Sequence, residues 1–227
     1  GKTLDITSPI SGKIMKANLN KVKDVVNDLP FMSLERAEML AEFFVDNNIV
    51  KILELGFNYG VSTCYMASSL EQVNESSIVT IDLESAKTRK PNIEQLLKKI
   101  GQFDKVNIYY EPTSYTWRLM KLLEEDSNPR FDFCYIDGAH SWFIDGFAFF
   151  LVDRLLKPNG WILFDDLNWS YEKSPSLREK DWVKAMPKEE REALQVKKIW
   201  DILVKTHPQY GNFKVMYDEW GLAQKIK

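Results

Sequence analysis

The chain has 227 residues, of which 44% are hydrophobic and 28% charged, a composition typical of one globular domain with a substantial core. Its formal net charge is -3 with both signs interspersed, which argues against a nucleic acid or an anionic membrane surface as partner. Apolar runs are too short for a membrane helix, and the start of the chain lacks a signal-peptide pattern, so we expect a cytoplasmic protein.

The first segment, residues 1–30, is polar, and its apolar residues are too scattered to predict an element. Ser33 has the character of a helix N-cap, and the residues after it form an apolar stripe at helical spacing. The stripe consists of Leu34, Ala37, Leu40, Ala41 and Phe44. We therefore expect an N-terminal helical extension over residues 1–46, which could pair subunits in a homo-oligomer, and a single domain over residues 47–227.

From residue 49 onward, short apolar runs alternate with helical segments, a pattern typical of βαβ units on a parallel sheet that is buried on both faces. The expected strands are 50–55, 78–81, 106–110, 131–136 and 161–164. Two further strands, 213–217 and 221–226, are predicted to form an antiparallel hairpin at the sheet edge. The pattern indicates an α/β fold with helices on both faces.

Helices are predicted between these strands from capping and turn residues. One helix begins near Pro91 and stops at Gly101, and another begins after Ser114. A third is expected over residues 141–156, followed by a turn at residues 157–160. A last helix is expected to end at the His207-Pro208 pair.

The first expected strand ends in an acidic, glycine-containing motif of the form ExGxxxG, with Glu54, Gly56 and Gly60 at the fixed positions. Gly56 permits a tight turn, and Gly60 precedes a helix whose first amides can face a ligand. The second strand ends at Asp82, 22 positions after Gly60, as is usual for a carboxylate that binds a ribose diol. The alternatives are an ordinary strand-to-helix turn and a solvated aspartate.

The fourth and fifth strands also end in acidic residues: Asp137 in one case, Asp165 and Asp166 in the other. Neighbouring parallel strands would bring these carboxylates together, and their repulsion favours a hard divalent cation such as Mg²⁺ between them. His140 follows Asp137 closely and is a candidate general base. The alternative is that the aspartates cap helices or accept backbone N–H groups, and that the histidine only packs.

Four segments taken together, ILELGFNYGVST, VTIDLE, FDFCYIDGAHSW and LKPNGWILFDDLNW, resemble class I S-adenosylmethionine-dependent methyltransferases. They are most similar to the metal-assisted O-methyltransferases related to macrocin O-methyltransferase. The resemblance implies a Rossmann-like, mostly parallel sheet of seven strands with an antiparallel C-terminal hairpin. It also implies Mg²⁺ or another divalent cation on Asp137, Asp165 and Asp166, with His140 as the base. The implied cofactor-binding residues are Glu54, Gly56, Asn58, Tyr59, Gly60, Asp82, Ser114 and Asp137.

The resemblance implies methyl transfer to a hydroxyl of a sugar, glycan or small natural product. Trp142, Trp169 and Tyr171 are candidates to stack on the substrate, and the charged stretch 170–186 is a candidate lid. One alternative is a nicotinamide-dependent oxidoreductase, which Asp82 would also suit, although the glycine spacing opposes it. The other is a binding protein that retains the cofactor pocket without turnover.

Overall fold

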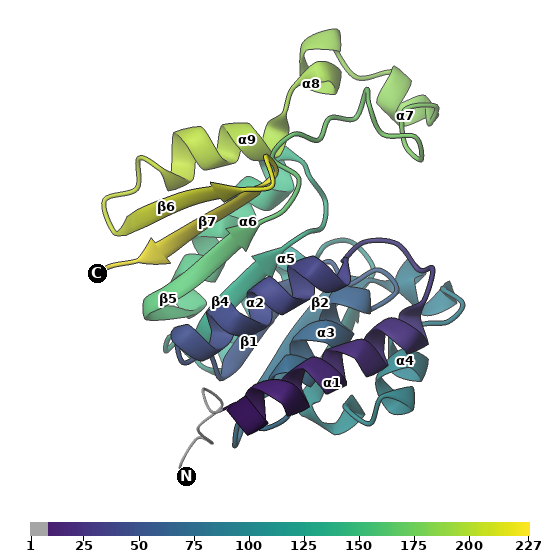
Figure 1. Ribbon diagram of the computed structural model, residues 1–227. Helices are drawn as coiled ribbons and strands as arrows, with labels where there is room; N and C mark the ends of the chain where they lie inside the picture. The colour runs from purple at the N-terminus through teal and green to yellow at the C-terminus, as the bar shows by residue number, and fades with distance from the viewer. Residues whose placement is uncertain (1–8) are drawn as a thin grey trace.

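A computed structural model describes residues 9–227, so residues 1–8 of the predicted N-terminal extension lie outside the described residues. Figure 1 shows the helices arranged around a central sheet. The helices are α1 (Pro9–Val26), α2 (Leu34–Asp46), α3 (Val61–Ser69), α4 (Ile93–Lys99), α5 (Tyr115–Glu125), α6 (Trp142–Leu155), α7 (Asp181–Lys184), α8 (Lys188–Glu192) and α9 (Gln195–Ile199). Tighter or wider turns form η1 (Glu84–Thr88), η2 (Phe103–Lys105) and η3 (Trp200–Val204). The strands are β1 (Lys51–Leu55), β2 (Ser77–Leu83), β3 (Val106–Glu111), β4 (Phe131–Ile136), β5 (Leu156–Phe164), β6 (Tyr210–Met216) and β7 (Trp220–Lys225).

The sheet has seven strands in the order β3-β2-β1-β4-β5-β7-β6. The five strands from β3 to β5 pair in parallel, whereas β7 pairs antiparallel with both β5 and β6. The predicted Rossmann-like sheet with an antiparallel C-terminal hairpin is therefore confirmed. The chain order reverses at β1, which lies between β2 and β4, and this is the position at which open parallel sheets bind ligands.

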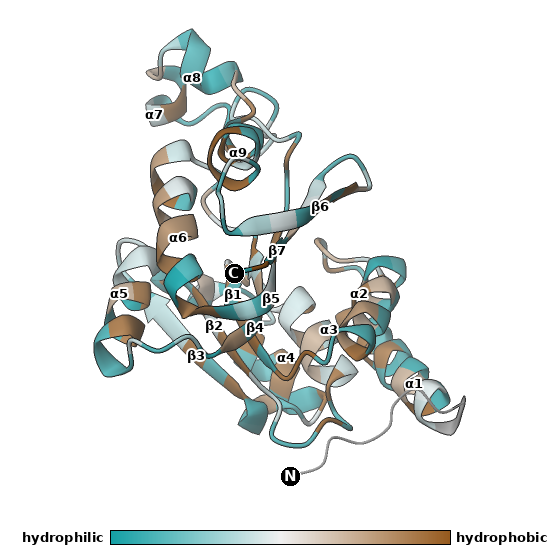
Figure 2. Ribbon diagram, turned by 90° about the vertical axis from the view of Figure 1, so that its left-hand side faces the viewer, coloured by the Kyte–Doolittle hydropathy of each residue, from teal (hydrophilic) through white to brown (hydrophobic). Residues whose placement is uncertain are grey.

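Two hydrophobic cores cover the two faces of the sheet, because successive side chains of a strand point to opposite sides. Ile52 and Phe133 pack with α1 to α4, while their neighbours Leu53 and Cys134 pack with α5, α6 and α9. Figure 2 shows α5 and α6 on one side of the strands and α2 and α3 on the other. Burial on both faces explains why the strands are apolar runs without alternation. Cys64 and Cys134 are both buried free thiols.

Within the expected N-terminal helical extension, helix α1 itself was not placed, because its apolar residues are scattered along the segment. Met15, Leu19, Val22 and Val26 nevertheless recur at helical spacing, and all four side chains are buried against the sheet domain. Other apolar residues, such as the 45% exposed Ile14, lie off this stripe and obscure it in the sequence. The predicted cap of α2 is confirmed, since the Ser33 hydroxyl accepts the Arg36 N–H at 3.2 Å.

The turn predicted at residues 157–160 lies inside β5 and does not precede it. Phe131 pairs with Leu156 and Phe133 with Trp161, so four residues of β5 bulge between two paired positions. Asn159 takes a left-handed conformation with φ of 71° within this bulge. The turn residues were correctly identified, but pairing with β4 begins before them. Among residues 9–227, no helix combines the length and the apolar character required to cross a membrane.

Candidate active site

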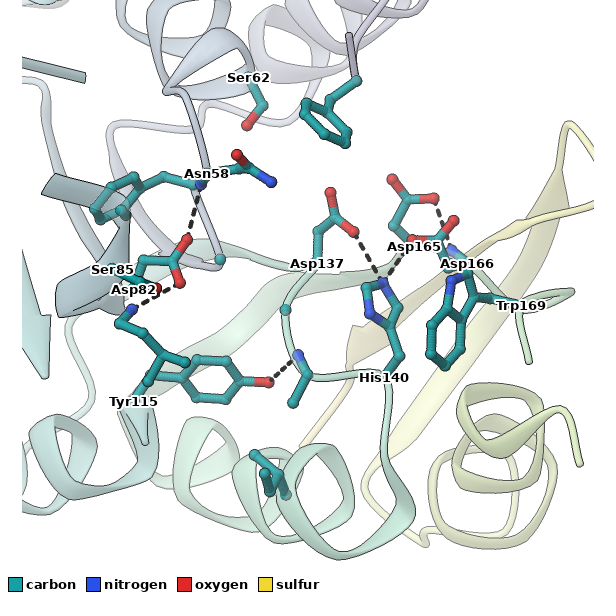
Figure 3. Close-up of a pocket in the computed structure, with 18 of the residues that line it drawn as sticks. Asn58, Ser62, Asp82, Ser85, Tyr115, Asp137, His140, Asp165, Asp166 and Trp169 are labelled. Atoms are coloured by element: carbon teal, nitrogen blue, oxygen red, sulfur yellow. Dashed lines mark hydrogen bonds and ion pairs between the residues drawn. The ribbon is translucent and has the colours of Figure 1, made fainter. Parts of the chain in front are cut away.

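A cavity of about 600 Å³ opens at the carboxyl ends of β1, β2, β4 and β5. The residues predicted from the sequence that line it are Gly56, Asn58, Asp82, Ser114, Asp137, His140, Asp165 and Asp166. Figure 3 shows Asn58 and Asp82 on one side of this cavity and His140 with Asp165 and Asp166 on the other. The fold thus gathers strand ends that are far apart in the chain. The other three predicted site residues, Glu54, Tyr59 and Gly60, are not among the residues that line the cavity.

The turn after β1 requires glycine at its first position. Gly56 has φ of 89°, and a Cβ atom there would lie 2.0 Å from the carbonyl oxygen of Asp137. Gly60 caps α3 in the left-handed region, and its N–H binds the carbonyl of Phe57 at 2.7 Å. The backbone after β1 therefore passes directly against the end of β4. The first residues of α3, Val61 and Ser62, line the cavity.

Glu54 is completely buried and anchors this turn from behind. Its carboxylate accepts the hydroxyls of Ser62 at 2.5 Å and Thr80 at 2.7 Å, and also that of Thr63. Burial raises the pKa of Glu54, and the hydroxyl hydrogen bonds offset only part of that effect. Because Ser62 and Thr63 belong to the first turn of α3, this network fixes the helix start relative to the sheet.

Asp82 is the next-to-last residue of β2, and two backbone N–H groups hold its carboxylate. Its Oδ2 accepts the Asn58 N–H at 2.8 Å, and its Oδ1 accepts the Leu83 N–H at 2.7 Å. Each carboxylate oxygen has a further lone pair available for another donor. The carboxylate is thus oriented beside the glycine turn, as the sequence spacing predicts.

On the opposite side of the cavity, His140 lies between two carboxylates. Its Nε2 is 2.6 Å from Oδ2 of Asp166 and 3.4 Å from Oδ1 of Asp137. The Trp169 ring stacks on the imidazole with centroids 4.6 Å apart. His140 and Asp166 both have left-handed backbones, with φ of 62° and 66°. Non-glycine residues in this region are uncommon and cluster at functional sites.

The electrostatics of this cluster show that its carboxylates are crowded. Burial and repulsion by Asp165 raise the pKa of Asp137 well above its usual value. Burial and the charge of Asp166 likewise raise the pKa of Asp165 to about 6. Burial alone would lower the pKa of His140, but hydrogen bonds to Asp137 and Asp166 outweigh it and raise this pKa to about 10. A positive charge is therefore favoured between the carboxylates.

The acidic residues fit a divalent cation by their donor chemistry. Two groups of potential ligand atoms lie within 4.8 Å of one another: Asp137 with His140 and Asp166, and Asp165 with Asp166 and Glu219. Asp166 is shared by both groups, so the predicted set of Asp137, Asp165 and Asp166 is divided between them. Carboxylate oxygens are the ligands preferred by Mg²⁺. The raised pKa of Asp137 and of Asp165 means that a cation there would relieve existing repulsion.

Arg36 and Glu219 belong to this site but were not predicted from the sequence. Glu219 lies in the turn between β6 and β7 and lines the cavity, and Arg36 of α2 forms an ion pair with it. The predicted hairpin offered a signal for Glu219. Strand β7 runs antiparallel to β5, with Gly221 paired to Phe164, so the residues at the start of β7 lie beside the end of β5. Arg36 had no comparable signal, because its position depends on how α2 packs.

The segment after β5 covers one rim of the cavity. Trp169, Ser174 and Leu177 line the cavity, and Tyr171 contacts the rings of both Trp169 and Trp182. Figure 1 shows α7 and α8 projecting from the body of the protein beyond this rim. Trp142, a predicted stacking residue, lies outside the cavity lining.

A family model described as a methyltransferase domain matches residues 53–167, about half of the chain. The match extends from β1 to just beyond β5 and includes Asp82, Asp137, His140 and Asp166. A search of curated proteins gives no significant match.

Solved structures with the same fold include several methyltransferases. The O-methyltransferase TomG from Streptomyces achromogenes, involved in tomaymycin synthesis and solved with SAM, has a TM-score of 0.64 at 17% identity, covering 92% of this chain and 90% of its own. An O-methyltransferase from Bacillus cereus in complex with SAH has a TM-score of 0.62 at 18% identity, covering 92% and 89%. The SAH-bound methyltransferase PaMTH1 from Podospora anserina has a TM-score of 0.64 at 17% identity, covering 99% of both chains. At these identities the similarity shows a shared fold.

Proposed function

The chain belongs to the methyltransferase domain family, and on this premise we propose that it transfers a methyl group from S-adenosylmethionine to a hydroxyl oxygen of a sugar, glycan or small natural product, assisted by a divalent cation. One observation carries the proposal: an oriented carboxylate beside a glycine turn and a histidine between carboxylates face each other across one cavity. The first arrangement suits a nucleoside, and the second suits removal of a proton.

The donor half of the cavity consists of the glycine turn, Asp82 and the end of β3. Asp82 accepts hydrogen bonds from the ribose diol through the lone pairs that Asn58 and Leu83 leave available. The close backbone approach at Gly56 and the start of α3 accommodate the methionine part. Ser114, which lines the cavity after β3, lies near the adenine. SAM and SAH in the structural neighbours TomG, PaMTH1 and the Bacillus enzyme support this donor.

In the acceptor half, Asp137, Asp165 and Asp166 would hold the divalent cation, and Glu219 would offer a further oxygen. When bound, Mg²⁺ lowers the pKa of a hydroxyl and stabilises the negative charge that develops on its oxygen. In its neutral form His140, whose Nε2 lies at the cavity beside Asp137 and Asp166, would take the hydroxyl proton on that nitrogen. Trp169 restricts rotation of the imidazole by stacking on it. Methyl transfer then depends mainly on alignment of the oxygen with the methyl group.

The two alternative functions differ in what the cavity binds. Membership of the methyltransferase domain family favours S-adenosylmethionine over a nicotinamide. The strained backbone of His140 and its position between carboxylates favour a catalytic site over a protein that only binds the cofactor.

Calorimetry with S-adenosylhomocysteine and with NADH tests the donor independently of the acceptor, and we expect binding of the first alone. Transfer of an isotopically labelled methyl group to a panel of hydroxyl compounds then tests the reaction, with Mg²⁺ or with EDTA. We expect activity to be lost in EDTA and restored by Mg²⁺. Activity that survives EDTA would remove the cation from the proposal.

His140→Gln tests the base. We expect S-adenosylhomocysteine affinity within about threefold of wild type and kcat reduced by about 100-fold or more. Asp104→Asn, an exposed carboxylate on η2, is the matched surface control. An unchanged kcat in His140→Gln would contradict the assignment.

A further inference from the structure

The loop that carries His140 is enclosed by two buried side chains that the reaction itself does not use. The loop comprises Gly138, Ala139 and His140, between the end of β4 and the start of α6. Tyr115 begins α5 and is 4% exposed, and Asp145 lies in the first turns of α6 and is 1% exposed. Figure 3 shows Tyr115 and Trp169 on opposite sides of this loop.

Hydrogen bonds connect these two side chains to consecutive amides of the loop. The Tyr115 hydroxyl donates to Oδ1 of Asp145 and accepts the Ala139 N–H at 3.1 Å. Oδ2 of Asp145 accepts the His140 N–H at 2.9 Å. The loop also packs closely against the tyrosine, since a Cβ atom on Gly138 would lie 2.4 Å from the Tyr115 ring. The backbone of the loop is thus held by direct bonds and by contact.

Asp145 is not needed to cap its own helix. The Ser141 hydroxyl accepts the Ile144 N–H, and the Ser141 carbonyl accepts the Asp145 N–H, so Ser141 already performs this role for α6. Both carboxylate oxygens of Asp145 instead bind groups outside the helix. Burial of this carboxyl is costly, as its raised pKa of about 7 shows, and His140 has an unfavourable backbone conformation.

We propose that Asp145 and Tyr115 are positioning residues, which hold the strained His140 loop so that its imidazole stays aligned with the carboxylates and with the acceptor hydroxyl. This proposal depends on the function proposed above only for the role of His140 in turnover. The alignment itself can be observed without a substrate.

The test uses Asp145→Asn and Tyr115→Phe, with the double variant. Asparagine cannot accept from both the Tyr115 hydroxyl and the His140 N–H without placing its NH₂ group against a donor. Phenylalanine removes the hydroxyl that binds Ala139. We expect each single variant to lower kcat by about 30- to 100-fold, with S-adenosylhomocysteine affinity within about threefold of wild type. The kcat of the double variant should be only slightly lower than that of the slower single variant, because both substitutions disrupt the same hydrogen-bond network.

The same helix provides a matched control. Near the far end of α6, Asp153 accepts the Tyr210 hydroxyl at 2.8 Å, so it forms a second tyrosine–aspartate pair remote from the cavity. Asp153→Asn and Tyr210→Phe should alter stability and leave kcat within about twofold of wild type.

A spectroscopic measurement separates positioning from general destabilisation. The chain has 2 histidines, so the ring signals of His140 and His207 can be followed individually by NMR. We expect the variants at Asp145 and Tyr115 to shift or broaden the His140 signal and to leave that of His207 unchanged. The variants at Asp153 and Tyr210 should do the opposite, because His207 packs on Tyr210 with centroids 5.1 Å apart.

If no methyl transfer is found, the function proposed above fails, and the NMR pattern still reports whether the loop is held as described. If Asp145→Asn does not fold, Tyr115→Phe carries the test. An unchanged His140 signal in these variants would overturn the proposal, as would kcat equal to that of wild type.

Discussion

Arg36 of α2 forms an ion pair with Glu219, a residue 183 positions later in the chain, at the edge of the cavity. The Arg36 guanidinium also lies over the rings of Tyr217 and Trp220, at 4.5 Å and 5.1 Å from their centroids. Burial would raise the pKa of Asp166, but His140 and the hydrogen bond with Asp137 lower it, and the charge of Arg36 adds a smaller lowering effect. Helix α2 therefore contributes to the electrostatics of the site through Arg36.

Arg36→Ala should lower the free energy of unfolding by about 1–2 kcal/mol, because it removes an ion pair and two cation–π contacts in a half-buried setting. Arg36→Lys should lower the free energy of unfolding by less than Arg36→Ala. Urea unfolding provides the measurement, with Lys197→Ala as control, since the ion pair of Lys197 with Asp201 lies on the surface. The control should change stability by no more than about 0.5 kcal/mol. Equal stabilities of Arg36→Ala and wild type would be inconsistent with a structural role for this contact.

Asp82→Ala should weaken binding of S-adenosylhomocysteine by about tenfold or more, because in the proposed function it removes the half-buried carboxylate that accepts from the ribose. Asp82→Asn should lose less affinity, since one oxygen remains. Isothermal titration calorimetry measures both, with Asp104→Asn as a control outside the cavity. Affinity that does not change in Asp82→Ala would show that this carboxylate has no part in donor binding.

Glu54→Ala should destabilise the fold by about 3 kcal/mol or more, because three hydroxyls that donate to this buried carboxylate lose their acceptor. Thr80→Val removes only one of these donors and should cost about 1 kcal/mol. Urea unfolding compares the two variants. If Glu54→Ala is no less stable than Thr80→Val, the network does not anchor α3 as the hydrogen bonds indicate.

Asp145 makes the stability of the fold depend on pH. Burial, only partly offset by the N–H groups of His140 and Ala139, raises its pKa from 3.8 to about 7 in the folded protein. Because the folded pKa exceeds the unfolded one, its contribution to stability is present below pH 3.8 and is lost as the pH rises through about 7. Asparagine does not titrate.

The free energy of unfolding of wild type minus that of Asp145→Asn should therefore fall between about pH 4 and pH 7 and level off above about pH 8. Urea unfolding of both proteins at intervals across this range is the measurement. Asp153→Asn, which disrupts the control pair of Asp153 with Tyr210, should not show the same change of stability difference with pH. A constant difference between wild type and Asp145→Asn would show that Asp145 titrates at its ordinary pKa.

The regular elements could be predicted where local chemistry specifies them. Strands buried on both faces are continuous apolar runs, and serines at helix starts accept the amides that the first turn leaves free, as Ser33 and Ser114 do. Helix α1 was not placed because apolar residues off its buried stripe, such as the exposed Ile14, blur the helical spacing. The bulge in β5 was read as a turn, since a local sequence does not show which strand lies beside it.

The sequence by itself determined the succession of strands along the chain, the glycine turn after β1 and the acidic residues near the strand ends, because each depends on backbone geometry or burial within a few residues. Only the tertiary structure decided that His140 lies between Asp137 and Asp166, that Glu54 stays behind the cavity wall, and that Arg36 reaches Glu219. These relationships depend on how strands and helices pack across the sheet, and packing joins residues whose separation along the chain carries no signal of their proximity.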